Sequence, residues 1–301
     1  LCSYSNHATP RVYEMVTLPD HKTVRKLEDN AALKEVYASY GFRPREYFQV
    51  DIGEAVLDGW MIKPRDFDPA KKYPVIFHIY GEPASSTVQN SWSGDYWNQL
   101  LAQQGYIIAS IDPRGTNNPK GRAWRKSIYG KVGILAMADH AKAVRLAEEM
   151  FPFMDPKRVG VWGWSGGGSS TAHLMFEHPD IYSVGIAVAG VYSQRLYDSI
   201  YQERYMGLPS TNPDGYREGS PITHAAGLEG DLLLIHGTGD DNVHYQSLEM
   251  LVNELVKQGK MFSMMAYPMR THGISERENT TMHLYRTMLK YWLEHLPAGG
   301  R

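Results

Sequence analysis

The run Gly163-Trp164-Ser165-Gly166-Gly167 is the strongest candidate for chemistry in this sequence. It directly follows a short apolar run at 159–162 and precedes a stretch that is compatible with a helix. A serine flanked by glycines at a sharp strand-to-helix turn is typical of a nucleophile elbow, because the glycines avoid clashes with neighbouring backbone. The helix that begins there would point its N–H groups at a developing oxyanion. We therefore predict that Ser165 is a nucleophile, the alternative being a chance glycine-rich turn.

A serine hydroxyl needs a base to remove its proton and a carboxylate to orient that base. An apolar run at 232–235 leads into a loop that carries Asp240 and Asp241, and a run at 262–267 leads to His272. The chain order of serine, acid and histidine is the order of an α/β-hydrolase. The loops at the carboxyl ends of strands are also where open α/β sheets build their sites. Order and position predict a triad but leave the choice between Asp240 and Asp241 open.

Metal and nucleotide sites are weaker interpretations. The sequence has 12 histidines, and His236 and His244 lie close together, but they form no H-E-x-x-H pattern and have no cysteine partners. Structural histidines explain both better. The glycine-rich stretch 163–168 lacks the Lys-Ser/Thr ending of a phosphate-binding loop. We therefore expect no metal and no cofactor.

Six short apolar runs must form the elements that position these residues. They cover 74–79, 106–111, 159–162, 184–189, 232–235 and 262–267. Continuous apolar runs of this length are typical of parallel strands that are buried on both faces. Amphipathic helical patterns recur after them, for example at 143–150, 248–256 and 282–292. The alternation predicts an α/β fold with a doubly wound, mostly parallel sheet.

The first 30 residues have a different pattern. Partial alternation at 13–18 and 23–27, around a Pro-Asp turn, predicts a pair of hairpin strands. A lone hairpin is marginal in water, so this pair must dock on something. A short helix is expected at 31–40 and an exposed strand region at 48–62.

Composition excludes several classes of protein. The chain has 301 residues, 43% hydrophobic and 21% charged, which is typical of an ordinary globular protein. Lys+Arg 31 against Asp+Glu 33, with no basic block, argues against a nucleic-acid partner. No apolar stretch approaches the roughly 18 residues of a spanning helix. The single cysteine, Cys2, excludes an internal disulfide.

Several motifs together resemble the hydrolase domain of the prolyl oligopeptidase family of serine peptidases, and most closely its dipeptidyl peptidase IV branch. The resemblance covers nearly the whole chain. The stretches that carry it are 163–167, Asp198-Ser199-Ile200-Tyr201-Gln202-Glu203-Arg204-Tyr205-Met206-Gly207, His236-Gly237-Thr238-Gly239-Asp240-Asp241-Asn242-Val243-His244, and His272-Gly273-Ile274. Leu27-Glu28-Asp29-Asn30 and Tyr80-Gly81-Glu82-Pro83 also fit.

The resemblance implies catalytic roles. Ser165 would be the nucleophile, Asp240, the first of the acidic pair, the orienting acid, and His272 the general base. The phenol of Tyr80 and the backbone N–H of Gly166 would form the oxyanion hole.

The resemblance also implies substrate-binding residues. Asn242 would hydrogen-bond a substrate carbonyl, and a hydrophobic specificity pocket would be lined by Val191, Tyr197, Tyr201 and Val243. An aromatic-walled slot buries a proline-sized ring well.

Two departures from the family pattern affect that pocket. Gly166 stands where the branch usually has an aromatic residue, and Gln194 stands where it usually has a tryptophan. Both changes should widen the pocket or make it more polar. The residue preferred at the cleaved bond therefore stays open.

In this family a β-propeller precedes the hydrolase domain and supplies acidic residues that bind the free N-terminus of the substrate. The resemblance therefore implies that residues 1–30 are the remnant of a last propeller blade with its linker and that 31–301 form the catalytic domain. It also implies a homodimer through the hydrolase domain, for which the helical pattern at 280–296 is a candidate interface or plain core. A periplasmic or other extracytoplasmic location is expected, with a cytoplasmic one as the alternative.

The resulting hypothesis is a serine peptidase that releases N-terminal dipeptides, after proline or alanine, through an acyl-enzyme on Ser165. An acylaminoacyl peptidase or an esterase on the same fold is the nearest alternative. A catalytically silent binding protein is the alternative from another class. It would require a broken triad, whereas all three members are present in the sequence.

Overall fold

An eight-stranded sheet carries most of the chain in the computed structural model, which describes residues 1–83 and 85–301. Its strands are β4 (Glu46–Asp51), β5 (Val56–Ile62), β6 (Tyr73–His78), β7 (Ile107–Ile111), β8 (Met154–Trp164), β9 (Val184–Val188), β10 (Asp231–Gly237) and β11 (Ser263–Tyr267). The strand order is β11-β10-β9-β8-β6-β7-β5-β4. All pairs from β11 to β7 are parallel, whereas β5 and β4 are added antiparallel. The predicted doubly wound, mostly parallel sheet is confirmed.

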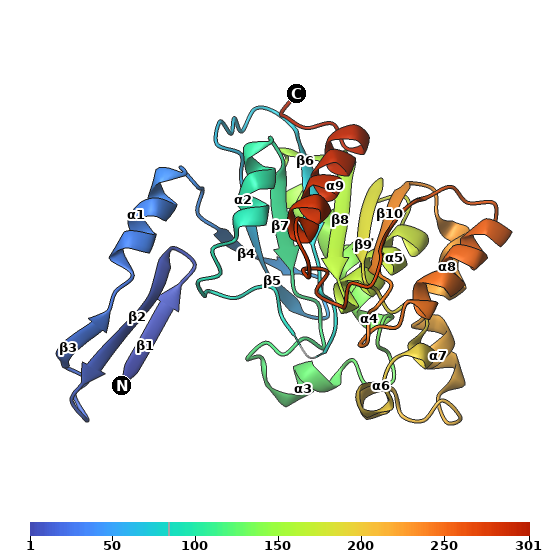
Figure 1. The fold of residues 1–301 in the computed structure, drawn as a ribbon, viewed down its shortest axis with the longest axis horizontal. Coiled ribbons are helices and arrows are strands. Elements are labelled where there is room, and N and C mark those ends of the chain that lie inside the picture. The colour runs from blue at the N-terminus through green and yellow to red at the C-terminus, as the bar shows by residue number, and fades with distance from the viewer. Residues whose placement is uncertain (84) are drawn as a thin grey trace.

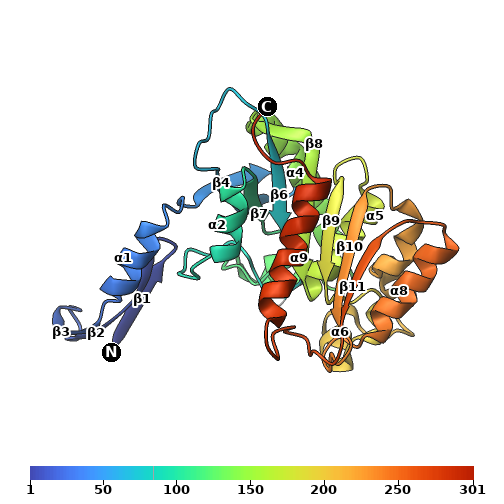
Figure 2. The same cartoon turned by 45° about the horizontal axis from the view of Figure 1, so that its top comes forward.

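Helices cover both faces of this sheet (Figures 1 and 2). The longer ones are α2 (Tyr96–Gln103), α4 (Leu135–Met150), α5 (Gly166–Glu177), α8 (Gln246–Lys257) and α9 (Thr280–His295). Residues of α2 and α9 share one hydrophobic core, and residues of α4, α5 and α8 share the other. Burial on both faces explains why the strands are continuous apolar runs.

Three short helices gather at the end of the sheet to which the arrow of β8 points (Figure 1). They are α3 (Gly121–Lys126), α6 (Ser199–Met206) and α7 (Pro213–Glu218), and two 3₁₀ turns, at Gln194–Leu196 and Pro221–Gly227, accompany them. This is the carboxyl end of the parallel strands, where α/β sheets hold their sites.

The first 30 residues form a separate antiparallel sheet. Its strands are β1 (Cys2–Asn6), β2 (Thr9–Val16) and β3 (Thr23–Glu28), and α1 (Ala31–Ser39) lies beside it, away from the large sheet (Figure 1). The predicted hairpin pair and the helix that follows it are confirmed. The sequence patterns did not reveal β1, because its five residues are too few and too polar to give a clear pattern.

Polar and aromatic contacts join this small sheet to the rest of the chain. The backbone N–H of His7 donates to Asn90 Oδ1 at 3.0 Å, and the His7 ring meets Tyr47 edge-on at 5.4 Å. Tyr37 of α1 packs in the same manner on Trp92. The expectation that an isolated hairpin must dock is therefore met by side chains of the larger unit.

Two predicted strand environments were wrong. The region 48–62 is not simply exposed, because β5 pairs with both β4 and β7 and Trp60 is only 1% exposed. The run at 262–267 is not buried on both faces, because β11 is the edge strand and Met264 is 47% exposed. Position in the sheet, which a local apolar run does not encode, decides both cases.

Trp292 of α9 belongs to the core. It is fully buried, and a Cβ at Gly160 of β8 would lie 2.6 Å from its ring. The helical pattern at 280–296 was interpreted as either a dimer interface or plain core, and for Trp292 core packing is the correct description. None of the helices in the described ranges is long and apolar enough to cross a membrane.

Candidate active site

Ser165 occupies a strained turn between β8 and α5. Its backbone has φ 59° and ψ −122°, a conformation that L-residues rarely adopt. The flanking glycines are required by close approach, because a Cβ at Gly163 or Gly167 would lie 2.4 or 2.3 Å from the carbonyl oxygen of Ile79. The loop after β6 thus presses directly against the turn. The structure has the strand–turn–helix context that the motif predicts.

This strain gives a prediction about stability. Alanine must adopt the backbone conformation of Ser165 at a cost of roughly 1–3 kcal/mol, whereas glycine adopts it without that strain. Ser165→Gly should therefore be more stable than Ser165→Ala, by about 1 kcal/mol after the greater chain entropy of glycine is subtracted. Thermal unfolding of the two variants side by side measures this, and equal midpoints would argue against strain at the turn.

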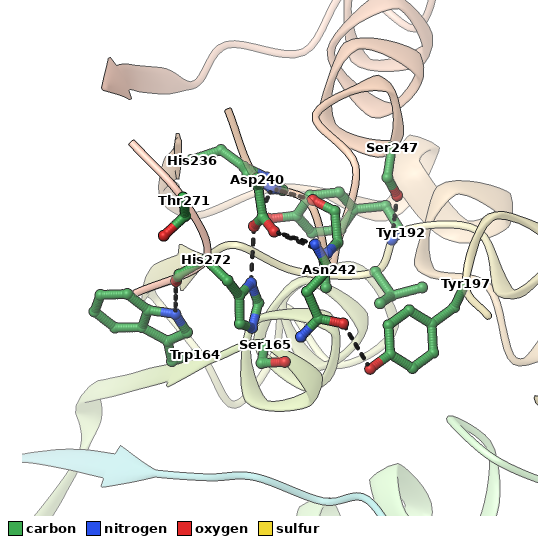
Figure 3. A network of polar contacts seen from close by, with 12 residues as sticks. Trp164, Ser165, Tyr192, Tyr197, His236, Asp240, Asn242, Ser247, Thr271 and His272 are labelled. Carbon is green, nitrogen blue, oxygen red and sulfur yellow. Dashed lines mark hydrogen bonds and ion pairs between the residues drawn. The ribbon is translucent and has the colours of Figure 1, made fainter. Parts of the chain in front are cut away.

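His272 and Asp240 meet beside Ser165 (Figure 3). His272 Nδ1 lies 2.8 Å from Asp240 Oδ2. Because an ionised carboxylate only accepts, Nδ1 carries the hydrogen and Nε2 keeps its lone pair. Figure 3 shows the His272 ring between Asp240 and Ser165, so that this lone pair faces the side where the hydroxyl lies. The loops after β8, β10 and β11 thus assemble the predicted triad.

Four donors hold the Asp240 carboxylate. Besides His272, Oδ2 is approached by His236 Nε2 at 3.1 Å, and Oδ1 accepts from the backbone N–H groups of Asn242 and Val243 at 3.0 and 2.9 Å. Burial acts to raise the pKa of Asp240, but the hydrogen bonds from His236 and His272 and from the backbone outweigh it. The pKa therefore lies well below its ordinary value. The acid stays ionised and fixed in orientation.

His236 is a positioning residue that the sequence did not distinguish from an ordinary buried histidine. It is fully buried, and its Nε2 lies 2.8 Å from the carbonyl oxygen of Val243 as well as near Asp240. Two acceptors at one nitrogen require that Nε2 carries the hydrogen. The expectation of a structural histidine is confirmed for His236, whereas His244 is exposed.

Trp164 is a second positioning residue without a sequence-based role. Its indole N–H donates to the backbone carbonyl of His272 at 2.9 Å (Figure 3). The residue before the nucleophile thereby ties down the loop that carries the base. Its place inside the elbow motif was the only available signal.

Tyr80 and Gly166, the predicted oxyanion donors, line the same cavity as Ser165. Gly166 is the first residue of α5, where a backbone N–H has no partner within the helix. Burial and the neighbouring Glu82 raise the pKa of Tyr80, and a hydrogen bond with the Ser165 side chain opposes that rise. The phenol therefore stays protonated and lies within reach of Ser165.

A cavity of about 30 Å³, called here the Ser165 pocket, opens next to the nucleophile. Its lining residues are Tyr80, Glu82, Ser165, Gly166, Val191, Tyr197, Tyr201 and Gln202. The predicted wall residues Val191, Tyr197 and Tyr201 are thus in place. Val243 is not among the lining residues, because it is buried behind Asp240, to which it donates its backbone N–H.

The two departures from the family pattern have different outcomes. Gly166 does not widen the pocket, because the Glu82 side chain fills the space beside it, and a Cβ at Gly166 would lie 2.3 Å from Glu82 Cγ. Gln194 is buried and donates to the carbonyl oxygen of Gly219 at 2.8 Å, and Gln202 contacts its Oε1. Gln194 thus does not line the Ser165 pocket, whose polar lining residues include Glu82 and Gln202.

Asn242 stands at the rim of the site. Tyr197 donates its hydroxyl hydrogen to Asn242 Oδ1 at 3.1 Å (Figure 3). With its oxygen engaged, the amide presents its N–H₂ as a donor. This geometry fits the predicted contact with a substrate carbonyl.

One group of side chains in the ranges 1–83 and 85–301 has the spacing of metal ligands, and it lies outside the triad. The atoms of His173, Glu177 and His224 lie within 4.8 Å of one another. Glu177 approaches His173 Nε2 at 2.8 Å and His224 Nδ1 at 3.3 Å. The two histidines thus converge on one carboxylate, and burial lowers the pKa of His173, which favours its neutral form. The pair His236 and His244 does not form such a group.

Curated proteins with similar sequences are peptidases by name. The chain is 35% identical to human "Prolyl endopeptidase FAP" over 281 residues, which is 91% of this chain and 36% of that protein. It is 38% identical to "Venom dipeptidyl peptidase 4" of Vespula vulgaris, over 90% of this chain and 35% of that protein. The chain thus spans about a third of the length of these relatives.

Solved structures and a family model agree with this similarity. The chain superposes on the crystal structure of Porphyromonas gingivalis dipeptidyl peptidase 4 with a TM-score of 0.93 at 37% identity, covering 98% of this chain and 41% of that one. A putative dipeptidyl aminopeptidase IV from Bacteroides ovatus gives a TM-score of 0.90 at 32% identity, with the same coverage. The model of the prolyl oligopeptidase family matches residues 92–299, a range that holds the elbow, the acid and the base. This chain belongs to the prolyl oligopeptidase family.

Proposed function

We propose that this chain is the catalytic domain of a serine peptidase that releases dipeptides from the free N-termini of peptides. The contact between His272 Nδ1 and Asp240, with the imidazole beside Ser165, carries the proposal (Figure 3). A silent binding protein would have no need for a low-pKa carboxylate that orients a base next to a strained serine.

The reaction follows from these positions. His272 Nε2 takes the proton of the Ser165 hydroxyl as Oγ attacks the carbonyl carbon of the scissile amide. The phenol of Tyr80 and the N–H of Gly166 donate to the resulting oxyanion. His272 then protonates the leaving amine, and an acyl-enzyme remains. Water, deprotonated by His272, hydrolyses that ester and restores Ser165. Asp240 stays ionised throughout.

The names of similar proteins support the proposal that the released product is an N-terminal dipeptide. Two of the similar proteins given above, one from a wasp and one from a bacterium, are called dipeptidyl peptidase 4. The name of the human relative is that of an endopeptidase. Substrates with a free N-terminus and substrates with a blocked N-terminus must therefore be compared.

The test uses the full-length protein and dipeptide amides of one leaving group, with the N-terminus either free or acetylated. Cleavage of the free substrates, with little cleavage of acetylated ones, is expected. Preference for the acetylated form would indicate an acylaminoacyl peptidase or an endopeptidase. Hydrolysis of the matching esters without any amide cleavage would indicate an esterase. Failure of a fluorophosphonate probe to label Ser165 would contradict serine catalysis.

The oxyanion role of Tyr80 gives a separate prediction. Tyr80→Phe removes one donor from the developing oxyanion and should lower kcat by about 10²–10³-fold with a small change in KM. Tyr129→Phe, at an exposed tyrosine, serves as the control and should behave as the unchanged protein. A rise in KM at constant kcat would instead assign Tyr80 to ground-state binding.

A further inference from the structure

Glu82 is a buried acid inside the Ser165 pocket to which the reaction above gives no role. It follows Tyr80 and Gly81 in the loop after β6, and it is only 7% exposed. The loop can turn back over α5 because Gly81 has φ +75° and a Cβ there would lie 2.5 Å from Ser170 Oγ. The backbone thereby directs the Glu82 side chain toward Gly166.

Glu82 and a side chain at position 166 exclude each other. Because a Cβ at Gly166 would lie 2.3 Å from Glu82 Cγ, the carboxyl group enters the pocket only when residue 166 is glycine. The glycine at position 166 thus leaves the space that the Glu82 side chain occupies. An acidic group therefore forms part of the pocket wall beside Ser165.

The Glu82 carboxyl has hydrogen-bonding capacity left for a ligand. Tyr201 donates its hydroxyl hydrogen to Oε2 at 2.9 Å. No other side chain or backbone group in the described parts of the chain bonds to this carboxyl, which leaves Oε1 without a partner among those residues. Burial raises the pKa of Glu82 to about 7, with the hydrogen bond from Tyr201 opposing the rise. Both the ionised and the protonated form are therefore accessible near neutral pH.

We infer that Glu82 determines specificity at the residue whose carbonyl is attacked, and that it selects a small side chain with a hydroxyl group, serine or threonine, over alanine and proline. The inference rests on the proposed peptidase function. A hydroxyl both donates and accepts, so it pairs with either protonation state of the carboxyl. A methyl group or a pyrrolidine ring pairs with neither and leaves the buried acid without solvent or partner. With about 30 Å³ of space, the pocket favours a short side chain over lysine or arginine.

The experiment compares X-Ser, X-Ala and X-Pro amides that share the same first residue and leaving group. For the unchanged protein, kcat/KM should be about 10- to 100-fold higher for X-Ser than for X-Ala. Glu82→Met, which keeps the length of the side chain and removes the carboxyl, should bring this ratio close to one and raise the relative rate on X-Pro. Glu203→Met makes the same change at an exposed position of α6 and should keep the ratio.

The outcomes separate the inference from the proposed function. If the fluorophosphonate probe labels Ser165 and amides are cleaved, but X-Ser and X-Ala react equally, the inference about Glu82 fails and the peptidase stands. A ratio that survives in Glu82→Met also overturns it, as does a preference for basic residues. If no amide is cleaved, the proposed function itself fails.

The steric conflict between Glu82 and a side chain at position 166 can be tested by a measurement of thermal stability, which is independent of activity. Gly166→Ala should lower the thermal midpoint by several degrees because its Cβ collides with Glu82. Adding Glu82→Gly to Gly166→Ala should restore much of that loss. If Gly166→Ala alone is as stable as the unchanged protein, Glu82 does not fill the space as inferred.

Discussion

Replacing Ser165 by alanine should abolish amide hydrolysis, with kcat lowered by about 10⁶-fold. The loss is large because no other group in the site can form the acyl-enzyme. His272 would retain its bond to Asp240 but would have no hydroxyl to deprotonate. Only the residual effect of the oxyanion donors and of substrate binding would remain, about 10³–10⁴-fold over water.

The measurement combines steady-state kinetics with labelling by a fluorophosphonate, read by mass spectrometry. Ser165→Ala should neither turn over substrate nor take up the probe. It should unfold cooperatively at nearly the same temperature, because serine and alanine suffer the same backbone strain at φ 59°. Ser210→Ala, at an exposed serine, is the matched control. Turnover that survives Ser165→Ala, or label found on another serine, would refute the assignment of the nucleophile.

Replacing Asp240 by asparagine should lower kcat by about 10⁴-fold. The backbone N–H groups of Asn242 and Val243 face Oδ1, so the amide oxygen of an asparagine must take that position. Its N–H₂ group would then face His272 Nδ1 and His236 Nε2. His272 would accept at Nδ1 and carry its hydrogen on Nε2, which is the wrong tautomer for a base toward Ser165. The geometry would survive while the base is lost.

Asp241→Asn provides the control within the same loop. Asp241 is exposed, and its variant should keep nearly full activity. The comparison decides experimentally between the two carboxylates, whose spacing alone did not distinguish them. Equal losses in both variants would indicate a loop effect rather than a role of Asp240 in orienting the base.

The local patterns of the sequence were sufficient for the nucleophile, the base and the parallel sheet. An elbow at Ser165 needs only a strand, a tight turn and a helix in succession, and each has its own pattern within a few residues. The order of serine, acid and histidine follows from the order of the strands. The family resemblance was needed to choose Asp240, and the structure supplies the physical reason, because Asp240 is buried among four donors while Asp241 is exposed.

Features that depend on which segments come to lie side by side could not be predicted in this way. Strand order decides that β5 lies inside the sheet and that β11 lies at its edge. The course of the loop after β10 decides that Val243 is buried behind Asp240. None of these features follows from a local run of residues. The clearest case is Gly166. From the sequence alone its missing side chain implied a wider or more polar pocket, and in the fold the side chain of Glu82, from the loop after β6, fills that space.

The sequence by itself therefore predicted the chemistry, a serine activated by histidine and aspartate on a doubly wound sheet. Only the tertiary structure decided the character of the pocket beside that serine. The reason is physical: a nucleophile elbow is built by backbone conformation within one short segment, whereas the shape and polarity of a cavity are set by close packing between segments distant in the chain. That packing places the Glu82 side chain in the space that a side chain at position 166 would need.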